Sequence, residues 1–333
     1  MFDDLDPKDF EDTTSAVVAS CANLGSMAKR ARLLADAGLL SVITNEAAGG
    51  LGLPIKFAVP IVEKAAAGLL GFPLIETMLL ARALAAVDPD LAKQISEGEL
   101  LVTVAWTGVA EDKVVADAPM VAEADRVLIF RADGSAVLTK TGVSAKPEAG
   151  ASFDIDAPEA LVRLSGPLEG VILDAGAVQE LHANASVLRA AFVLGSAAQC
   201  LALAVEYAQD RFQFGSRLSG YQVLRHRMAR DALAVEILRT GIARAVAEPA
   251  EGAALARDAV WLAAARSGPV VAESAIQIFG GMGFTWDVPL HRHLRQIRAQ
   301  AGYGAAAERL ETLGDALLST PGNTWYGEIA NGV

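Results

Sequence analysis

The stretch from Arg211 to Gly304 decides the fold of this chain. It contains four short motifs, which are RFQFG at 211–215, YQ at 221–222, QIFGGMGF at 277–284 and RHLR at 292–295. An arginine fork can donate to two oxygens of one anionic group, and paired glycines let a backbone approach a ligand closely. Each motif alone is equally typical of a helix end followed by a turn. The interpretation therefore depends on their combination.

The composition describes a helical protein without a nucleic-acid partner. Of the 333 residues 53% are hydrophobic but only 6% are aromatic, so Ala, Leu and Val make the core, as suits closely packed helices. A net charge of −12 provides no basic surface to replace the counterions of a phosphate backbone. Two cysteines, Cys21 and Cys200, cannot form a disulfide framework, and we interpret them as buried thiols of a cytoplasmic protein.

The termini and apolar stretches predict a soluble chain. The N-terminal sequence MFDDLD is acidic and lacks the basic and then apolar order of a signal peptide. The most apolar region, from Ala65 to Ala86, is interrupted by Pro73, Glu76 and Arg82. We therefore expect a buried helical hairpin there and no membrane span.

The pattern of hydrophobic residues predicts helices, then a small β region, then helices. Apolar residues recur at helical spacing from Pro7 to Glu99, with a loop at 49–54. Short β-branched runs follow Leu100, and the turn at 132–135 separates two of them. Long helices resume near Asn184, and the segment 187–211 is apolar on nearly every face, which predicts burial among several helices.

Taken together, the motifs and this order resemble the acyl-CoA dehydrogenase family. The resemblance rests on the combination Gln-x-x-Gly-Gly-x-Gly-Phe after the RFQFG and YQ motifs, followed by Pro289 and Arg295. It implies a mainly α fold with a small β-barrel-like middle domain and a C-terminal four-helix bundle. The implied domains are residues 1–100, 101–178 and 179–333.

The resemblance also implies a flavin oxidoreductase that acts on CH–CH bonds. Its substrate would be an acyl-CoA, its cofactor FAD and its electron acceptor an electron-transfer flavoprotein. Subunits of the family share FAD across an interface, so we expect a homo- or hetero-oligomer, either a dimer or a tetramer. No metal site is expected, because His226, His291 and His293 sit among arginines as a solvated basic rim.

The family resemblance assigns the cofactor contacts of this chain. We expect Arg211 and Phe214 to end a long helix, with Gly215 as its C-cap, and to contact the FAD of a neighbouring subunit. The other positions that match the family's cofactor contacts are Tyr221, Gln222, Gln277, Gly280 and Gly281.

The catalytic base of the family has no counterpart in the matching positions. Abstraction of the substrate α-proton requires a carboxylate within hydrogen-bonding reach in a dry site. The family keeps a glutamate at the position of Gly304 or, in some members, at that of Ala185. Glu308 is a weak candidate for a displaced base, since it would share a helix face with Gly304 if both were helical. The catalytic residue therefore stays unknown.

The flavin cradle of the β domain also departs from the family. Of the family's Thr-Glu-Pro-x-Ala-Gly-Ser-Asp segment only Thr107 is kept, and Gly108 to Asp112 differ. Chains with these two losses resemble the short, non-catalytic subunit of heteromeric acyl-CoA dehydrogenases, known from bacterial steroid side-chain degradation.

Three interpretations follow. The chain is such a half-site subunit, or a self-sufficient dehydrogenase with a displaced base, or an assembly or regulatory protein without flavin.

Overall fold

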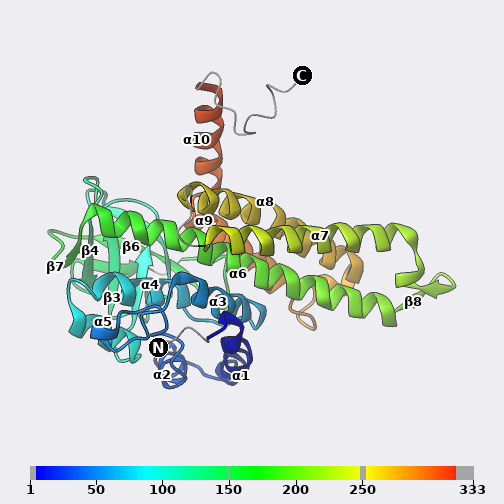
Figure 1. The fold of residues 1–333 in the computed structure, drawn as a ribbon, viewed down its shortest axis with the longest axis horizontal. Coiled ribbons are helices and arrows are strands. Elements are labelled where there is room, and N and C mark those ends of the chain that lie inside the picture. The colour runs from blue at the N-terminus through cyan, green and yellow to red at the C-terminus, as the bar shows by residue number, and fades with distance from the viewer. Residues whose placement is uncertain (1–4, 149, 248–252, 320–333) are drawn as a thin grey trace.

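The computed structural model describes residues 5–148, 150–247 and 253–319. Its elements follow the predicted order of helices, strands and helices (Figure 1). The β strands lie at one end of the molecule, and the long C-terminal helices run from them to a small hairpin at the opposite end.

The N-terminal region is built from short helices with clear capping residues. Ser26 accepts a hydrogen bond from the amide of Lys29, and Asp88 caps a later helix through Leu91. The turns are η1 Pro7–Phe10, η2 Glu46–Ala48 and η3 Ile55–Phe57, and the helices are α1 Glu11–Cys21, α2 Met27–Asp36, α3 Ala58–Ala67, α4 Leu74–Leu84 and α5 Pro89–Ser96.

The middle region consists of two small sheets. One has the strand order β1-β3-β4-β7, with β1 and β3 parallel, and the other has the order β2-β6-β5. The predicted turn at 132–135 joins β3 to β4, and Asp133 accepts from the amide of Ser135 there. The strands are β1 Val102–Ala105, β2 Val114–Pro119, β3 Arg126–Phe130, β4 Ala136–Lys140, β5 Ala145–Glu148, β6 Glu159–Leu164 and β7 Gly170–Leu173.

The C-terminal region is a helical bundle around α6, which begins after Asp174 caps its first turn. Between α6 and α7 the chain forms the hairpin β8–β9, and α10 projects from the bundle (Figure 1). The elements are α6 Ala175–Asp210, β8 Phe212–Gln213, β9 Ser216–Arg217, η4 Leu218–Gly220, α7 Gln222–Ala245, α8 Ala253–Phe279, η5 Gly280–Phe284, α9 Leu290–Tyr303 and α10 Ala306–Ser319.

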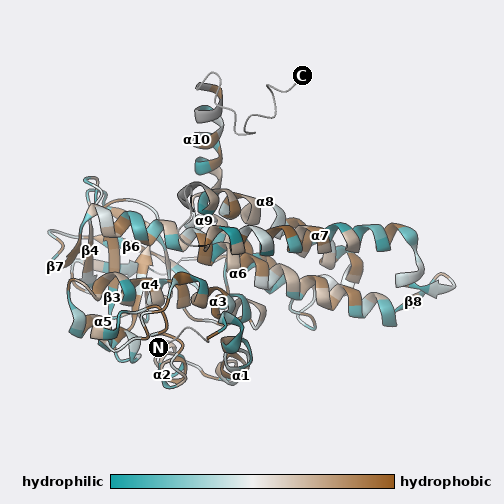
Figure 2. Ribbon diagram, in the orientation of Figure 1, coloured by the Kyte–Doolittle hydropathy of each residue, from teal (hydrophilic) through white to brown (hydrophobic). Residues whose placement is uncertain are grey.

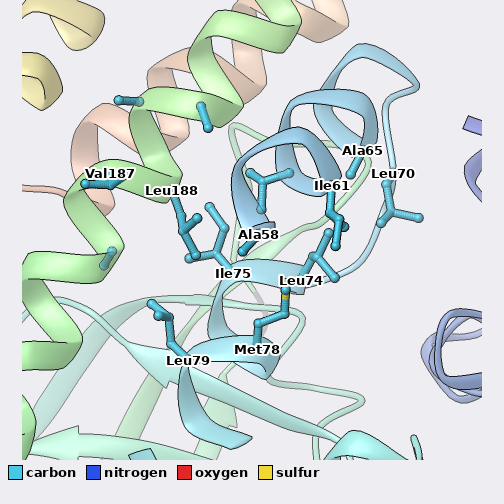
Figure 3. Packing of buried hydrophobic residues seen from close by; sticks show 14 of the residues in the cluster. Ala58, Ile61, Ala65, Leu70, Leu74, Ile75, Met78, Leu79, Val187 and Leu188 are labelled. Carbon is cyan, nitrogen blue, oxygen red and sulfur yellow. The ribbon is translucent and has the colours of Figure 1, made fainter. Parts of the chain in front are cut away.

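The main core lies where α3 and α4 pack on α6. Ile75 of α4 lies against Leu188 of α6, and Ile61 of α3 and Met78 of α4 gather around Leu74 (Figure 3). Figure 2 shows hydrophobic residues concentrated on the inner strands and on these central helices. The region from Ala65 to Ala86 is mostly buried, as predicted, but α3 and α4 are joined by a turn and each packs on α6, so they do not pair as the predicted helical hairpin.

The helix α6 is long and apolar enough to cross a membrane by composition alone, but 67% of its most apolar window is buried inside the protein. It is therefore the core helix of the bundle. The prediction that 187–211 is buried throughout is correct only in its first half. Val187 to Cys200 are mostly buried, whereas Tyr207 is half-buried and Arg211 is exposed. Both cysteines are free and buried, as predicted.

Candidate functional site

The two positions that match the family's catalytic base come close together in the fold. Gly304 follows the last residue of α9, and Ala185 lies in the buried part of α6. Arg309 in the first turn of α10 bridges them, since its guanidinium lies 3.5 Å from the Gly304 carbonyl and 3.1 Å from Ser186 Oγ. Arg309 thus links the two positions, and the region between them is called the base pocket.

A tryptophan occupies the space that a side chain at position 304 needs. Trp261 of α8 is fully buried, and its Nε1 donates to the Gly304 carbonyl over 3.1 Å. A Cβ atom on Gly304 would lie 2.2 Å from Cζ2 of Trp261. No carboxylate fits at this position while Trp261 keeps its place.

Glu308 does not share a helix with Gly304. The prediction of a shared helix face is wrong, because α9 ends at Tyr303 and α10 begins at Ala306, with Ala305 at a φ of +46° between them. Glu308 is exposed in the first turn of α10, where a carboxylate stabilises the helix dipole. It is not placed to act as a base in the pocket.

Beside Ala185 lies a buried charged centre that joins all three regions of the chain. Glu76 of α4 accepts a hydrogen bond of 2.8 Å from Nε1 of Trp106, which follows β1. The guanidinium of Arg189 in α6 lies 3.9 Å above the Trp106 ring. The exposed fractions of Glu76 and Arg189 are 3% and 1%.

The charges of this centre stabilise each other only in part. Burial raises the pKa of Glu76, and the charge of Arg189 and the hydrogen bond from Trp106 oppose that rise. Burial lowers the pKa of Arg189 to about 10, against the charge of Glu76. The Nε and Nη2 atoms of Arg189 have no hydrogen-bond partner among the described residues, so the cation–π contact with Trp106 supports the guanidinium.

A small polar cavity remains next to the charged centre. Its volume is about 20 Å³, which is room for about one water molecule. Gln296 and Gln300 of α9 line it with amide atoms that have no partner among the described residues. Asp154, which also lines it, has its pKa raised to about 6 by burial. The cavity is too small for an acyl chain.

The segment that matches the flavin cradle is engaged in its own hydrogen bonds. Thr107 Oγ1 donates to Asp117, and the amide of Val109 donates to Asp112 over 2.9 Å. The amide of Ala110 donates to the carbonyl of Phe130 over 2.7 Å. These donors are therefore not directed at a ligand.

The first group of predicted cofactor residues lies on an exposed arm. Here the structure corrects the expected helix end, because α6 stops at Asp210 and Arg211 is its C-cap. Phe214 and Gly215 form the turn of the β8–β9 hairpin at φ values of +54° and +86°, so Gly215 is not a helix cap. Phe214 is 91% exposed at the tip.

The turn of this arm is held by Tyr221, whose hydroxyl shares its proton between the carbonyls of Gln213 and Phe214, at 2.8 and 2.9 Å. Gln222 begins α7 and is exposed, as is Arg211. The side chain of Arg211 donates no hydrogen bond to another described residue. The hairpin backbone is therefore held in place, and the side chains of Arg211 and Phe214 are exposed on it.

The second group lies beside the first. Tyr207 in the last turn of α6 stacks on Phe279 at the end of α8, with ring centroids 4.1 Å apart. Gln277 is exposed in that last turn of α8, and Gly280 follows it at a φ of +63°. Added Cβ atoms at Gly280 and Gly281 would meet no atom within 4 Å. The backbone there is open to a ligand.

The exposed arm and the base pocket belong to different ends of α6. The helix carries Ala185 near its start and leads to Arg211 at its end, about 39 Å apart at a rise of 1.5 Å per residue. In Figure 1 the hairpin lies at the far end of the bundle from the β sheets. The arm therefore faces away from the pocket of its own chain.

One predicted surface residue lies in the core. His293 was expected in a solvated rim, but it is 1% exposed within α9, and burial lowers its pKa to about 3. The prediction is wrong for His293 because α9 turns that side chain inward, whereas His226 is exposed.

Comparison with known proteins identifies the family. The model of the acyl-CoA dehydrogenase C-terminal domain matches residues 176–316. Acyl-CoA dehydrogenase IpdE2 of Mycobacterium tuberculosis is 33% identical over 275 residues, covering 81% of this chain and 80% of the relative. IpdE2 of Mycolicibacterium smegmatis is 29% identical over 286 residues, 85% of this chain and 86% of the relative.

Solved structures share the fold. The ChsE4–ChsE5 complex from Mycobacterium tuberculosis contains a chain with a TM-score of 0.85 at 23% identity, covering 95% of this chain and 98% of that one. The steroid acyl-CoA dehydrogenase Tcur3481–Tcur3483 has the same TM-score and identity, with 94% and 98% covered. This chain belongs to the acyl-CoA dehydrogenase family and has its fold.

The residues fit one part of an FAD site and not the other. The arm and Gly281 are exposed and Gly280 is half-buried, and added Cβ atoms at both glycines would meet no atom, as cofactor contacts across an interface require. The segment after Thr107 offers no free cradle, and the pocket beside it is filled.

Sequence reasoning missed the residues that fill the pocket. A single carboxylate within the apolar run FPLIETMLL and a single arginine within ASVLRAAF were signals for Glu76 and Arg189. No local pattern marks Trp261 as the neighbour of Gly304.

Proposed function

We propose that this chain is the non-catalytic subunit of a heteromeric, FAD-dependent acyl-CoA dehydrogenase. A partner of the same family supplies the glutamate and the flavin cradle, and this chain supplies Arg211, Phe214, Gln222 and the 277–281 segment to the partner's FAD. When bound, FAD supplies the oxidant for α,β-dehydrogenation. One observation carries the proposal. Arg211 and Phe214 are exposed on the hairpin, whereas the space for a side chain at position 304 is filled by Trp261.

The substrate class follows from the relatives. The structural neighbour Tcur3481–Tcur3483 is described as a steroid acyl-CoA dehydrogenase. The neighbour ChsE4–ChsE5 is a complex of two different chains, which supports a heteromer. We therefore propose a bulky, steroid-derived acyl-CoA as substrate, an electron-transfer flavoprotein as acceptor and the cytoplasm as location. An assembly protein without flavin would not need Arg211 and Phe214 on an ordered, exposed hairpin.

The role of each arm residue follows from its chemistry. Arg211 would hold the FAD pyrophosphate with two parallel hydrogen bonds, and the Phe214 ring would cover an apolar face of the cofactor. Gln222 and Gln277 can each donate and accept a hydrogen bond. Tyr221 positions the hairpin and does not itself need to touch the cofactor.

The test is an electron-acceptor assay with short-chain, long-chain and steroid acyl-CoA thioesters. The purified chain alone should show negligible turnover, and turnover should appear when a complete family member is added as partner. General-base catalysis alone contributes about 10²–10⁴ in rate, so the difference is measurable. Robust turnover by the chain alone would contradict the proposal.

Arg211→Ala in the assembled complex should weaken FAD binding. Loss of a charged hydrogen bond costs roughly 1.5–3 kcal/mol, which is about a 10- to 100-fold rise in Kd. Arg244→Ala removes the same charge from an exposed position in the last turn of α7 and serves as control. Equal FAD affinity in both variants and the wild type would remove Arg211 from the site.

A further inference from the structure

The charged centre of Glu76, Trp106 and Arg189 lies beside the positions that the family resemblance assigns to the catalytic base and the flavin cradle. Arg189 follows Ala185 by four residues and so lies on the same face of α6. Trp106 directly precedes Thr107, and Tyr303 directly precedes Gly304. Ala185, Thr107 and Gly304, which mark the family's reaction site, are therefore each close to a residue that fills or borders this centre.

Aromatic rings extend this centre from the interior toward the surface. Arg189 lies on the Trp106 ring at 3.9 Å, and His182, one turn before Ala185, stacks on Phe130 with centroids 4.7 Å apart. His182 is exposed on its outer side and its ring is also 5.9 Å from that of Trp106. Inside, the described residues leave the water-sized cavity beside Gln296 and Gln300, and a separate, more open hollow of about 430 Å³ lies outside the centre, beside Leu79, Arg82 and Asn184.

The chemistry of the centre is unsuited to an apolar acyl chain. A guanidinium with two unpartnered nitrogen atoms and a carboxylate, both buried, would have to lie against hydrocarbon. Removing only one charge would leave the other uncompensated, so the pair can be replaced only together.

We infer that Glu76, Trp106, Arg189 and His182 form a built-in plug, which excludes acyl thioesters from the pocket of this chain. The inference rests on the proposed function, in which a partner subunit supplies the substrate pocket. It deepens that proposal, because the plug explains why this chain does not use a pocket of its own. The plug is a steric and electrostatic filler, and none of its four residues takes part in the chemistry.

The experiment measures binding of octanoyl-CoA to the full chain by equilibrium dialysis, with CoA alone as reference ligand. The carved variant Glu76→Ala/Arg189→Ala removes both charges and their volume. The matched control Glu76→Gln/Arg189→Met also removes both charges but keeps the pocket filled and retains an acceptor for Trp106 Nε1. A second variant, Glu76→Gln/Arg189→Ala, opens only the space of the guanidinium arm and is used if the carved variant does not fold.

We expect the wild type and the filled control to bind octanoyl-CoA no better than CoA. The opened variant, which is the carved variant or, if that does not fold, the second variant, should bind octanoyl-CoA at least about tenfold more tightly than CoA. The reason is that the acyl chain gains an apolar cavity. Preference of the wild type for octanoyl-CoA would overturn the plug, and so would the absence of any gain in the opened variant. Binding of octanoyl-CoA by the wild type without turnover contradicts only the plug, whereas turnover by the wild-type chain alone contradicts the proposed function.

Discussion

At the residue scale, both Gly304 and Trp261 account for the absence of a base at the end of α9. Gly304 lacks a side chain, and Trp261 fills the space where that side chain would be. The hydrogen bond from Trp261 Nε1 to the Gly304 carbonyl ties the end of α9 to α8. A glutamate cannot be restored here by one substitution.

Gly304→Glu should therefore destabilise the chain and should not produce dehydrogenase activity. Overpacking of a filled core typically costs 1–3 kcal/mol, and burial of an unpaired carboxylate adds to it. Thermal and urea unfolding measure the loss. Gly302→Glu is the matched control, since Gly302 is exposed and an added Cβ meets no atom within 4 Å.

The double variant Gly304→Glu/Trp261→Ala separates the two causes. Removal of the ring provides space for the new side chain, so the double variant should be more stable than additivity of the two single changes predicts. A Gly304→Glu variant as stable as the wild type would show that Trp261 moves away without cost.

At the scale of elements, the crossing of α3 and α6 depends on a glycine. Gly195 of α6 lies so close to α3 that an added Cβ would be 2.0 Å from the Glu63 carbonyl oxygen. Backbone atoms cannot turn aside as a flexible side chain can, so the two helices would have to separate. This crossing carries the core that Figure 3 shows.

Gly195→Ala should lower the free energy of unfolding by roughly 2 kcal/mol or more, although alanine favours helix formation. Gly314→Ala in α10 is the control, because no atom lies within 4 Å of its added Cβ, and it should be neutral or slightly stabilising. Chemical denaturation of both variants gives the comparison. Equal stability of the two would mean that α3 and α6 adjust freely.

At the scale of the whole molecule, the bundle leaves apolar residues uncovered. Leu233 and Ile237 of α7 are 61% and 58% exposed, and Phe214 and Trp286 are more exposed still. Exposed apolar residues that gather along one helix are typical of an interaction surface. Together with the arm, they indicate that the described residues complete their surface in an assembly.

We expect a dimer or tetramer, with itself or with a partner subunit, and no major monomer at micromolar concentration. Light scattering checks the mass against the 34.6 kDa of one chain. Leu233→Glu/Ile237→Glu should dissociate the assembly without unfolding the protein, because both side chains are exposed. Val87→Glu, at a 52% exposed position of the N-terminal region, should leave the mass unchanged, and a clean wild-type monomer would contradict the shared site.

Much of the fold is legible in the sequence because its signals are local. Helical spacing, β-branched runs and the turn at 132–135 each lie within one element, and the structure has these elements in that order. The predicted helix boundaries were wrong where a break of one or two residues ends a helix. The hairpin at Phe214 and Gly215 and the break at Ala305 each depend on one or two positive φ angles, which periodicity does not reveal.

The sequence by itself determined the family and the order of the regions, because motifs with fixed spacing within one chain segment carry that information. Only the tertiary structure decided that the pocket is filled. Glu76, Trp106 and Arg189 come from three regions, and Trp261 meets Gly304 from another helix. Such contacts result from helix packing, which sums many weak interactions across the whole core, and no single stretch of sequence specifies them.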